Sequence, residues 1–69
     1  MPDYTRLTVN INRETVAAMK AIAERRGISY TETIRRAVAV YKLVEDETAQ
    51  GHTIQIKDGE TVREVVFVA

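Results

Sequence analysis

Apolar and polar residues alternate strictly near the start of the chain. Leu7, Val9 and Ile11 fall on one side of an extended backbone, and polar residues stand between them. Successive side chains of a strand point to opposite faces, so this period of two predicts a half-buried strand over residues 4–11. The polar residues that share its outer face are Arg6, Thr8 and Asn10.

The period then changes to that of a helix. Apolar residues recur at steps of three and four, which predicts an amphipathic helix over residues 13–26. Asn12 stands directly before this helix, where a side-chain oxygen accepts a hydrogen bond from the free amides of the first turn. Gly27 follows the last turn and is the residue type that most often ends a helix. We therefore expect the helix to begin after Asn12 and to stop at Gly27.

A second helix is predicted over residues 30–48. Ser29 and Glu32 have the spacing of a capping box, in which the serine hydroxyl accepts a backbone hydrogen bond and the glutamate reaches back to the cap. The apolar residues of this helix form a broad stripe, and Gly51 follows its end. A stripe of that width predicts burial against more than one neighbour.

Residues 51–69 predict a β-hairpin that extends the chain beyond the second helix. Residues 53–57 and 61–68 have strand-like sequences, and the dipeptide Asp58-Gly59 is a strong turn signal. Residues 65–68 are apolar on both faces. Such a strand invites edge-to-edge pairing, so we expect it to be covered by the body of the protein or by a second chain.

Two loop lengths suit this turn. A two-residue loop at the Asp58-Gly59 dipeptide sets Ile56 opposite Thr61 and mixes apolar with polar residues on both faces. A three-residue loop over residues 57–59 sets Ile54 opposite Val62 and keeps apolar residues together. Because matched faces stabilise a hairpin, we expect the three-residue loop.

The size of the chain limits how it is stabilised. Its 69 residues form at most one small domain, and a chain this short buries only about 60% of its unfolded surface, so a lone core is marginal. The sequence has no cysteine, which excludes disulfides, thiolate metal sites and cysteine nucleophiles. A single histidine, His52, argues against a zinc site. Association with a second chain is the remaining source of stability.

Charge is distributed unevenly, although the net charge is zero. Residues 1–43 hold eight bases and four acids, a balance of +4, and residues 44–69 hold two bases and six acids, a balance of −4. This asymmetry is typical of a polyanion-binding part with an acidic appendage. The charge asymmetry alone is explained equally well by two solvated faces that bind no partner.

The sequence carries no sign of catalysis or of membrane insertion. It has no carboxylate pair in an identifiable pocket, no histidine-based nucleophile arrangement and no glycine-rich phosphate loop, so we expect a protein that is not an enzyme and uses no cofactor or metal. The longest apolar runs hold five residues, as at residues 65–69, and are too short to span a membrane. The first residues lack the layout of a secretory signal, so we expect a cytoplasmic protein.

The order of strand, helix, glycine-containing turn and helix resembles the ribbon-helix-helix DNA-binding family, of the Arc- and Met-repressor-like, CopG type. The residues that carry this resemblance lie at 6–12 and 27–32, within residues 4–46. It implies an α+β fold in which two chains intertwine and their N-terminal strands form a two-stranded antiparallel ribbon. Residues 1–50 then form the DNA-binding domain, and residues 51–69 form a hairpin extension.

In that family the ribbon enters the major groove of DNA. The resemblance therefore implies that Arg6, Thr8 and Asn10 contact bases. Arginine can pair with two acceptors of guanine, asparagine can pair with adenine, and threonine offers a hydroxyl and a methyl group. Leu7 and Val9, on the other face, belong to the shared core of the two chains, as does Ile11.

The start of the second helix is the second expected DNA contact. The resemblance implies that Ser29, Tyr30 and Thr31 hold a phosphate through free backbone amides, helped by the positive end of the helix dipole and by side-chain hydroxyls. Arg13, at the junction of strand and helix, is placed to reach a flanking phosphate.

Three functions fit these features. The leading hypothesis is a homodimeric, sequence-specific repressor of transcription bound to double-stranded DNA. The resemblance further implies higher-order assembly on DNA, with dimers side by side on adjacent half-sites. The alternative is an antitoxin that uses the same DNA-binding half and binds a toxin protein through its acidic C-terminal segment. A third interpretation is a protein-interaction module in which the first strand joins the hairpin of its own chain. That module is a monomer without salt-sensitive DNA binding.

Overall fold

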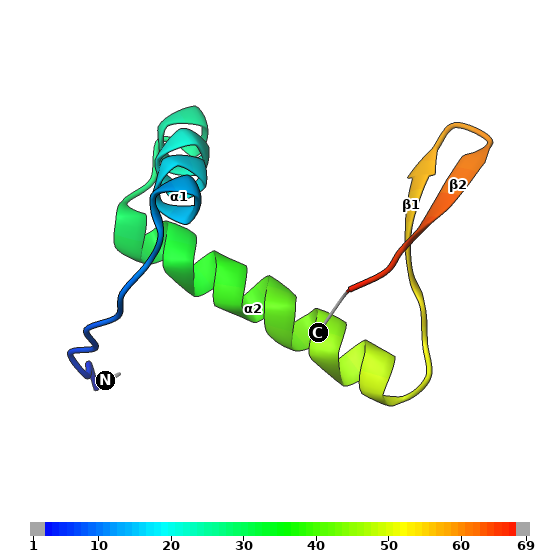
Figure 1. Ribbon diagram of the computed structural model, residues 1–69, viewed down its shortest axis with the longest axis horizontal. Coiled ribbons are helices and arrows are strands. Elements are labelled where there is room, and N and C mark those ends of the chain that lie inside the picture. Colours follow the sequence, from blue (N-terminus) through cyan, green and yellow to red (C-terminus); the bar gives the residue numbers. More distant parts are fainter. Residues whose placement is uncertain (1–2, 68–69) are drawn as a thin grey trace. The chain divides into compact units, whose positions relative to one another are not determined.

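The computed structural model describes residues 3–67 and contains two helices followed by a two-stranded antiparallel sheet (Figure 1). The elements are α1 (Arg13–Arg26), α2 (Tyr30–Ala49), β1 (Ile54–Asp58) and β2 (Thr61–Val65). The chain divides into two compact units, residues 1–33 and residues 34–69. Helices and an antiparallel sheet together confirm the α+β class. Neither of the two described helices is long and apolar enough to cross a membrane.

The first helix occupies the predicted residues, and its start is capped as expected. Asn12 has an extended backbone, with φ −69° and ψ 164°, and its side-chain oxygen accepts the backbone N–H of Thr15 at 2.8 Å. Glu14 lies in the first turn, while Arg25 and Arg26 lie in the last turn. Both charge placements are favourable for the helix dipole.

The end of α1 depends on the backbone of Gly27, which is left-handed with φ 65° and ψ 38°. Its N–H donates to the carbonyl of Glu24 at 3.3 Å, and the N–H of Ile28 donates to the carbonyl of Ala23 at 3.0 Å. These two bonds form a Schellman motif, which satisfies carbonyls that the helix end leaves open. Glycine fits there because it adopts positive φ without a steric penalty.

The second helix extends to Ala49, one residue beyond the predicted end. The N–H of Gly51 donates to the carbonyl of Thr48 at 3.0 Å, and the N–H of His52 donates to the carbonyl of Glu47 at 3.1 Å, so this helix ends in the same motif as α1. The ring Nδ1 of His52 also lies 2.5 Å from a carboxylate oxygen of Glu47.

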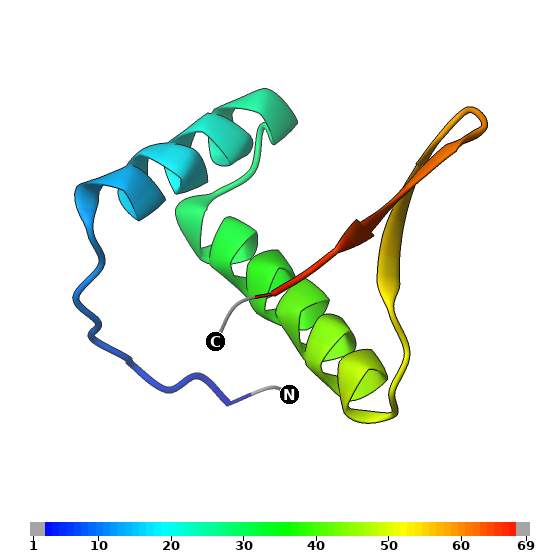
Figure 2. The same ribbon diagram turned by 45° about the vertical axis from the view of Figure 1, so that its right-hand side comes forward.

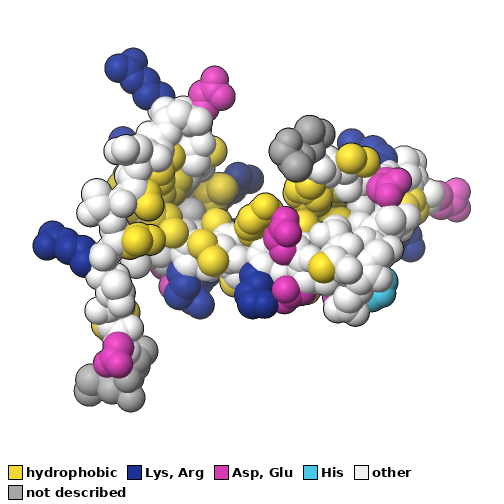
Figure 3. All heavy atoms as spheres, turned by 60° about the horizontal axis from the view of Figure 1, so that its bottom comes forward, with side chains coloured by type: hydrophobic (Ala, Val, Ile, Leu, Met, Phe, Trp, Pro, Cys, Tyr) yellow, Lys and Arg dark blue, Asp and Glu magenta, His cyan; other side chains and the backbone are white. Residues whose placement is uncertain are grey.

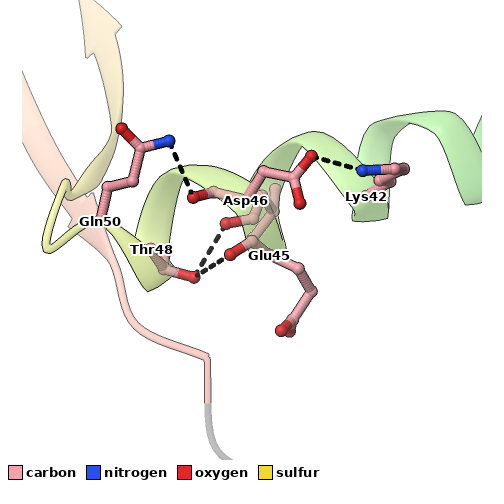
Figure 4. Close-up of polar contacts among 6 residues, drawn as sticks. Lys42, Glu45, Asp46, Thr48 and Gln50 are labelled. Carbon is pink, nitrogen blue, oxygen red and sulfur yellow. Dashed lines mark hydrogen bonds and ion pairs between the residues drawn. The ribbon is translucent and has the colours of Figure 1, made fainter.

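Polar contacts along the second half of α2 are local and exposed (Figure 4). Lys42 Nζ lies 2.6 Å from a carboxylate oxygen of Asp46, and the hydroxyl of Thr48 donates to the carbonyl of Val44 at 2.8 Å. An exposed ion pair of this kind contributes only about 0.3–0.5 kcal/mol. The last turn of α2 has no base, so the acidic residues 45–47 lie near the negative end of the helix dipole, which is unfavourable.

The pKa of one side chain of α2, that of Tyr41, is shifted. A hydrogen bond with Glu45 and the negative charge of that carboxylate both favour the neutral phenol of Tyr41, and slight desolvation acts in the same direction. The pKa of Tyr41 is therefore raised above its ordinary value of 10.0. Tyr41 carries no negative charge near neutral pH.

The hairpin is present, but the predicted register is wrong. Asp58 pairs with Thr61, so the loop holds two residues, Gly59 and Glu60, and neither loop considered from the sequence is the observed one. Gly59 has φ 59°, and no described residue other than glycine has positive φ, which matches a type II′ turn with glycine first.

This register follows from the demands of the turn and of burial. A loop of Gly59 and Glu60 gives glycine the first loop position, which needs positive φ in this turn. It also sets Ile54 opposite Val65, rather than opposite Val62 as expected, and these two residues are the half-buried ones of the two strands. They line an open groove of about 280 Å³ beside the last turn of α2, together with Thr48 and His52.

Very little of the chain is buried within itself. Among the described residues, only Ala23 and Thr33 are buried, with 2% and 5% of their surface exposed. Hydrophobic side chains therefore lie open on the surface in several places (Figure 3). The expectation that the chain's own body covers the last strand is not met, because Val66 is 75% exposed and Phe67 is 52% exposed. Val68, which belonged to the same expectation, lies outside the described residues.

Residues 3–12 contain no helix and no strand in the single chain (Figure 2). The sheet of the described residues holds only β1 and β2, so the first strand does not join the hairpin of its own chain. The described residues therefore contain no pairing of the kind that the third interpretation, the single-chain module, requires. The strand predicted over residues 4–11 has no strand partner among them.

Candidate nucleic-acid interface

The N-terminal segment, residues 3–12, is exposed on both of its faces. Leu7 is 81% exposed, Val9 57% and Ile11 41%, so exposure falls as the segment approaches α1. The polar residues between them are exposed as well. Backbone N–H and C=O groups need partners when they are buried, and this segment has no strand partner among the described residues. It therefore offers an apolar face, a polar face and a free backbone to another molecule.

The polar face has the chemistry that reads base edges. Arg6 brings a fixed fork of donors, Asn10 brings both a donor and an acceptor, and Thr8 brings a hydroxyl. Asn12 continues the alternation, but its side-chain oxygen is engaged by the backbone of Thr15. The two asparagines of this face therefore differ, since Asn12 caps α1 and Asn10 does not.

The start of α2 is organised around Ser29. Its hydroxyl accepts the N–H of Glu32 at 3.0 Å, and its carbonyl accepts the N–H of Thr33 at 3.0 Å, as the capping box predicts for the serine. A helix leaves its first amides without partners inside the helix. The amides of Tyr30 and Thr31 are the ones left at this end, where the dipole is positive. These exposed residues therefore form a suitable place for an anionic oxygen.

Thr33 is a residue that sequence reasoning missed. Its hydroxyl donates to the carbonyl of Ser29 at 2.9 Å, alongside the backbone bond to the same oxygen, and its side chain is buried. Two bonds to one carbonyl fix the direction in which the cap residue enters the helix. The signal was present in the sequence, since threonine often bonds to the carbonyl four residues before it.

Arg13 is the first residue of α1 and is exposed, one residue after the cap. The predicted phosphate contacts thus come from the starts of both helices. Among residues 3–67, no cluster of three or more potential metal ligands occurs. The chemistry that this surface offers is hydrogen bonding and positive charge.

Comparison with known proteins gives one match. The family model described as ribbon-helix-helix protein, copG family, matches residues 5–45. That range contains the N-terminal segment after Tyr4, all of α1 and most of α2, and it ends before the hairpin. Searches of the curated proteins and of the solved structures returned no significant match.

Proposed function

The chain belongs to the copG family of ribbon-helix-helix proteins, and from this premise we propose that it is a homodimeric, sequence-specific repressor of transcription. The family binds DNA, usually as dimers, and consists of transcription regulators and antitoxins. The matched range, residues 5–45, includes every residue that we expect to contact DNA. In this proposal, two N-terminal segments pair into a ribbon that enters the major groove.

The observation that carries the proposal is the unpartnered N-terminal segment. Pairing with the same segment of a second copy supplies the missing backbone hydrogen bonds. It also turns the apolar residues Leu7, Val9 and Ile11 inward together, because the side chains of paired strands share faces. The polar faces of both copies then lie side by side and project from the dimer as one surface.

The burial pattern supports a dimer in the same way. A chain with 45% hydrophobic residues buries only two described residues within itself, so most of its apolar surface still faces water. Exposed Ile34, Val38 and Tyr41 form a stripe on α2 at helical spacing. Burying apolar area contributes about 25 cal/mol per Å², and a second copy is the simplest source of that burial.

Recognition is divided between the two parts of the interface. We assign base contacts to Arg6, Thr8 and Asn10, since each can satisfy a distinct pattern of donors and acceptors in the major groove. Phosphate contacts at the start of α2, and at Arg13, hold the ribbon in register without reading sequence. We also assign residues 1–50 to the DNA-binding domain and residues 51–69 to an extension.

The antitoxin alternative uses the same DNA-binding half and differs in the role of the acidic C-terminal segment. Toxin-binding segments in this family tend to be flexible until they bind. Residues 54–65 instead form a defined hairpin with a tight turn, which favours the repressor. An antitoxin has a toxin partner that binds this segment, whereas the repressor acts without one.

Selection of bound duplexes from a randomised DNA pool tests the proposal. We expect enrichment of short repeated half-sites, with log affinity falling linearly as log salt rises at about 0.9 per phosphate contacted. Absence of enrichment and of salt dependence would contradict the proposal.

Matched variants assign the binding to the ribbon. Arg6→Ala and Arg63→Ala each remove one guanidinium from an exposed strand-like segment. We expect Arg6→Ala to weaken binding and relax one base position, while Arg63→Ala, on β2, leaves the selected sequence unchanged. Equal effects of the two variants would show that the affinity comes from overall charge rather than from the ribbon.

A further inference from the structure

Neither edge of the hairpin pairs with a third strand in the part of the chain that the structure describes. An isolated two-stranded hairpin is only marginally stable in water, and a third strand or a packed face is usually needed. Ile56 is 48% exposed and Val62 51% exposed, so the hairpin's apolar residues are open to solvent. The family match ends before the hairpin and assigns it no role.

The register shows which backbone groups point outward. In an antiparallel pair, residues alternate between those bonded to the partner strand and those directed away from it. Asp58 and Thr61 flank the two-residue loop and form a bonded pair, so Ile56 and Ile54 also bond inward to β2. Gln55 and Lys57 therefore direct their backbone groups to the free edge of β1. None of the backbone hydrogen bonds outside helices and strands in the described chain engages them.

We propose that β1 is an association surface for a second copy of this chain, and that the two β1 strands pair antiparallel about Gln55. In this register the two Gln55 residues stand opposite each other and exchange backbone bonds. Ile54 of each copy stands opposite Ile56 of the other, and Thr53 stands opposite Lys57. Every apolar residue of the strand meets an apolar residue, and no like charges meet.

Self-complementarity singles out this edge and this register. A two-fold axis between identical antiparallel strands requires one residue to stand opposite itself. Centring β1 on Lys57 sets two lysines together, and centring it on Ile56 sets Ile54 against Asp58. On β2, centring on Arg63 or Glu64 opposes like charges directly, which destabilises a sheet.

The paired hairpins would form a four-stranded sheet with two different faces. Ile54, Ile56 and Val65 share one face of each hairpin, because pairing sets Val65 beside Ile54. Arg63, Asp58 and Thr61 lie on this face as well, since Arg63 stands opposite Ile56 and Thr61 opposite Asp58. Two copies therefore bring six apolar residues together at the middle of one face, with these polar residues around them, while Gln55 and Glu64 lie on the opposite face. Four strands with such an apolar cluster come closer to the requirement for stability than two strands do. This association does not depend on DNA binding, so the two proposals fail separately.

Cysteine cross-linking of the full-length chain tests the pairing. Bonded antiparallel residues lie about 5.5 Å apart between Cα atoms, within the range that a disulfide spans. Because the chain has no cysteine, Gln55→Cys introduces the only thiol. We expect oxidation to convert most Gln55→Cys chains to a covalent dimer that reductant reverses.

Glu64→Cys is the matched control. Glu64 pairs with Gln55 within the hairpin and shares its face and its exposure, but it lies on the outer strand of the proposed sheet. Two such cysteines are three strand spacings apart, about 14 Å, so we expect no cross-link. Equal cross-linking of the two variants, or none for Gln55→Cys, would overturn the proposal.

Amide hydrogen exchange tests the same surface without a substitution. Pairing of β1 should protect the amides of Gln55 and Lys57 to the same extent as that of Ile56, while Val62 and Glu64, on the free edge of β2, exchange fast. If Ile56 is protected and Gln55 exchanges as fast as Val62, β1 is an open edge and the proposal is wrong.

Discussion

The N-terminal segment and the C-terminal hairpin both show the alternation of a strand, yet only the hairpin forms strands in the single chain. Residues 54–65 hold two strands next to each other through a tight turn at Gly59. Residues 4–11 alternate as regularly, but no neighbouring segment pairs with them. The difference shows that alternation decides which side chains share a face, while a partner decides whether a strand exists.

The cost of finding that partner also differs between the two regions. Closing a two-residue loop costs little conformational entropy, so a hairpin forms its first hydrogen bonds between neighbouring residues of one chain. The N-terminal segment gains its bonds only by association, which adds the loss of independent motion of a second molecule. Substitutions in the N-terminal segment should therefore affect association, whereas substitutions in the hairpin should act within the single chain.

Val9→Asp should have the largest effect. An uncompensated charge in the interior shared by two chains costs about 3–5 kcal/mol, comparable with the whole stability of a small domain. We expect loss of cooperative folding by circular dichroism and loss of the dimer by sedimentation. Thr8→Asp, on the outer face, is the control and should fold but lose DNA affinity. A stable Val9→Asp dimer would contradict the inward placement of Val9.

Asn10→Ala and Asn12→Ala should separate recognition from stability on one face of the segment. Loss of a bidentate contact relaxes discrimination at one base position by about 1–3 kcal/mol, so Asn10→Ala should change the selected DNA sequence without changing thermal stability. Asn12→Ala removes a cap and should lower stability by about 1 kcal/mol with the same base preference. If both variants gave the same profile, the assigned division of roles would be incorrect.

Gly59→Ala should act on the hairpin alone. At φ 59° an L-residue costs about 1–2 kcal/mol, and because nothing lies within 4 Å of an added Cβ, the cost comes only from the backbone. We expect faster hydrogen exchange across β1 and β2, with helix content retained. Glu60→Ala, at the other loop position, is the control and should leave exchange unchanged. Melting of the helices in Gly59→Ala would show that the hairpin supports the rest of the chain.

The smallest effect should come from α2, which connects the two regions. Glu45 raises the pKa of Tyr41, so Glu45→Gln should lower that pKa toward 10.0. A group whose pKa is raised on folding contributes stability below its unfolded pKa and loses it as pH rises through the folded value. The small contribution of this contact therefore fades only above about pH 10. Phenolate absorbance in a chain that retains Tyr41 as its single tyrosine measures the shift. In the chain with all its tyrosines, Glu45→Gln should leave DNA binding unchanged.

The helix ends were predictable because their determinants are local. Asn12, Gly27 and Ser29 each act on residues within about one turn, and the structure shows the bonds that their sequence positions predict. The second helix differs from its predicted end by one residue, at Ala49. The contribution of Thr33 was missed because a threonine inside a helix is usually assigned to solvent or to packing.

The hairpin register was not predictable from matched faces alone. Pairing Ile54 with Val62 matches apolar residues, but the turn requires Gly59 at the first loop position, and this requirement changes every cross-strand pair. Among the residues proposed to contact DNA, the structure places the cap at Ser29 and leaves the others exposed. Their roles depend on contacts with a second chain and with DNA. From one sequence, such contacts can be inferred only from the residue pattern and from the family.

Because the single chain has almost no hydrophobic core of its own, its folding depends on how much of the protein a cell contains. When folding requires association, the folded fraction depends on concentration, since stability cannot be separated from protomer concentration. A scarce chain, with only Ala23 and Thr33 buried among its described residues, spends more time in forms that proteases cleave. Dilution after cell division would then lower the concentration of folded protein by more than the dilution factor. The folded protein would persist only above a threshold concentration of the chain.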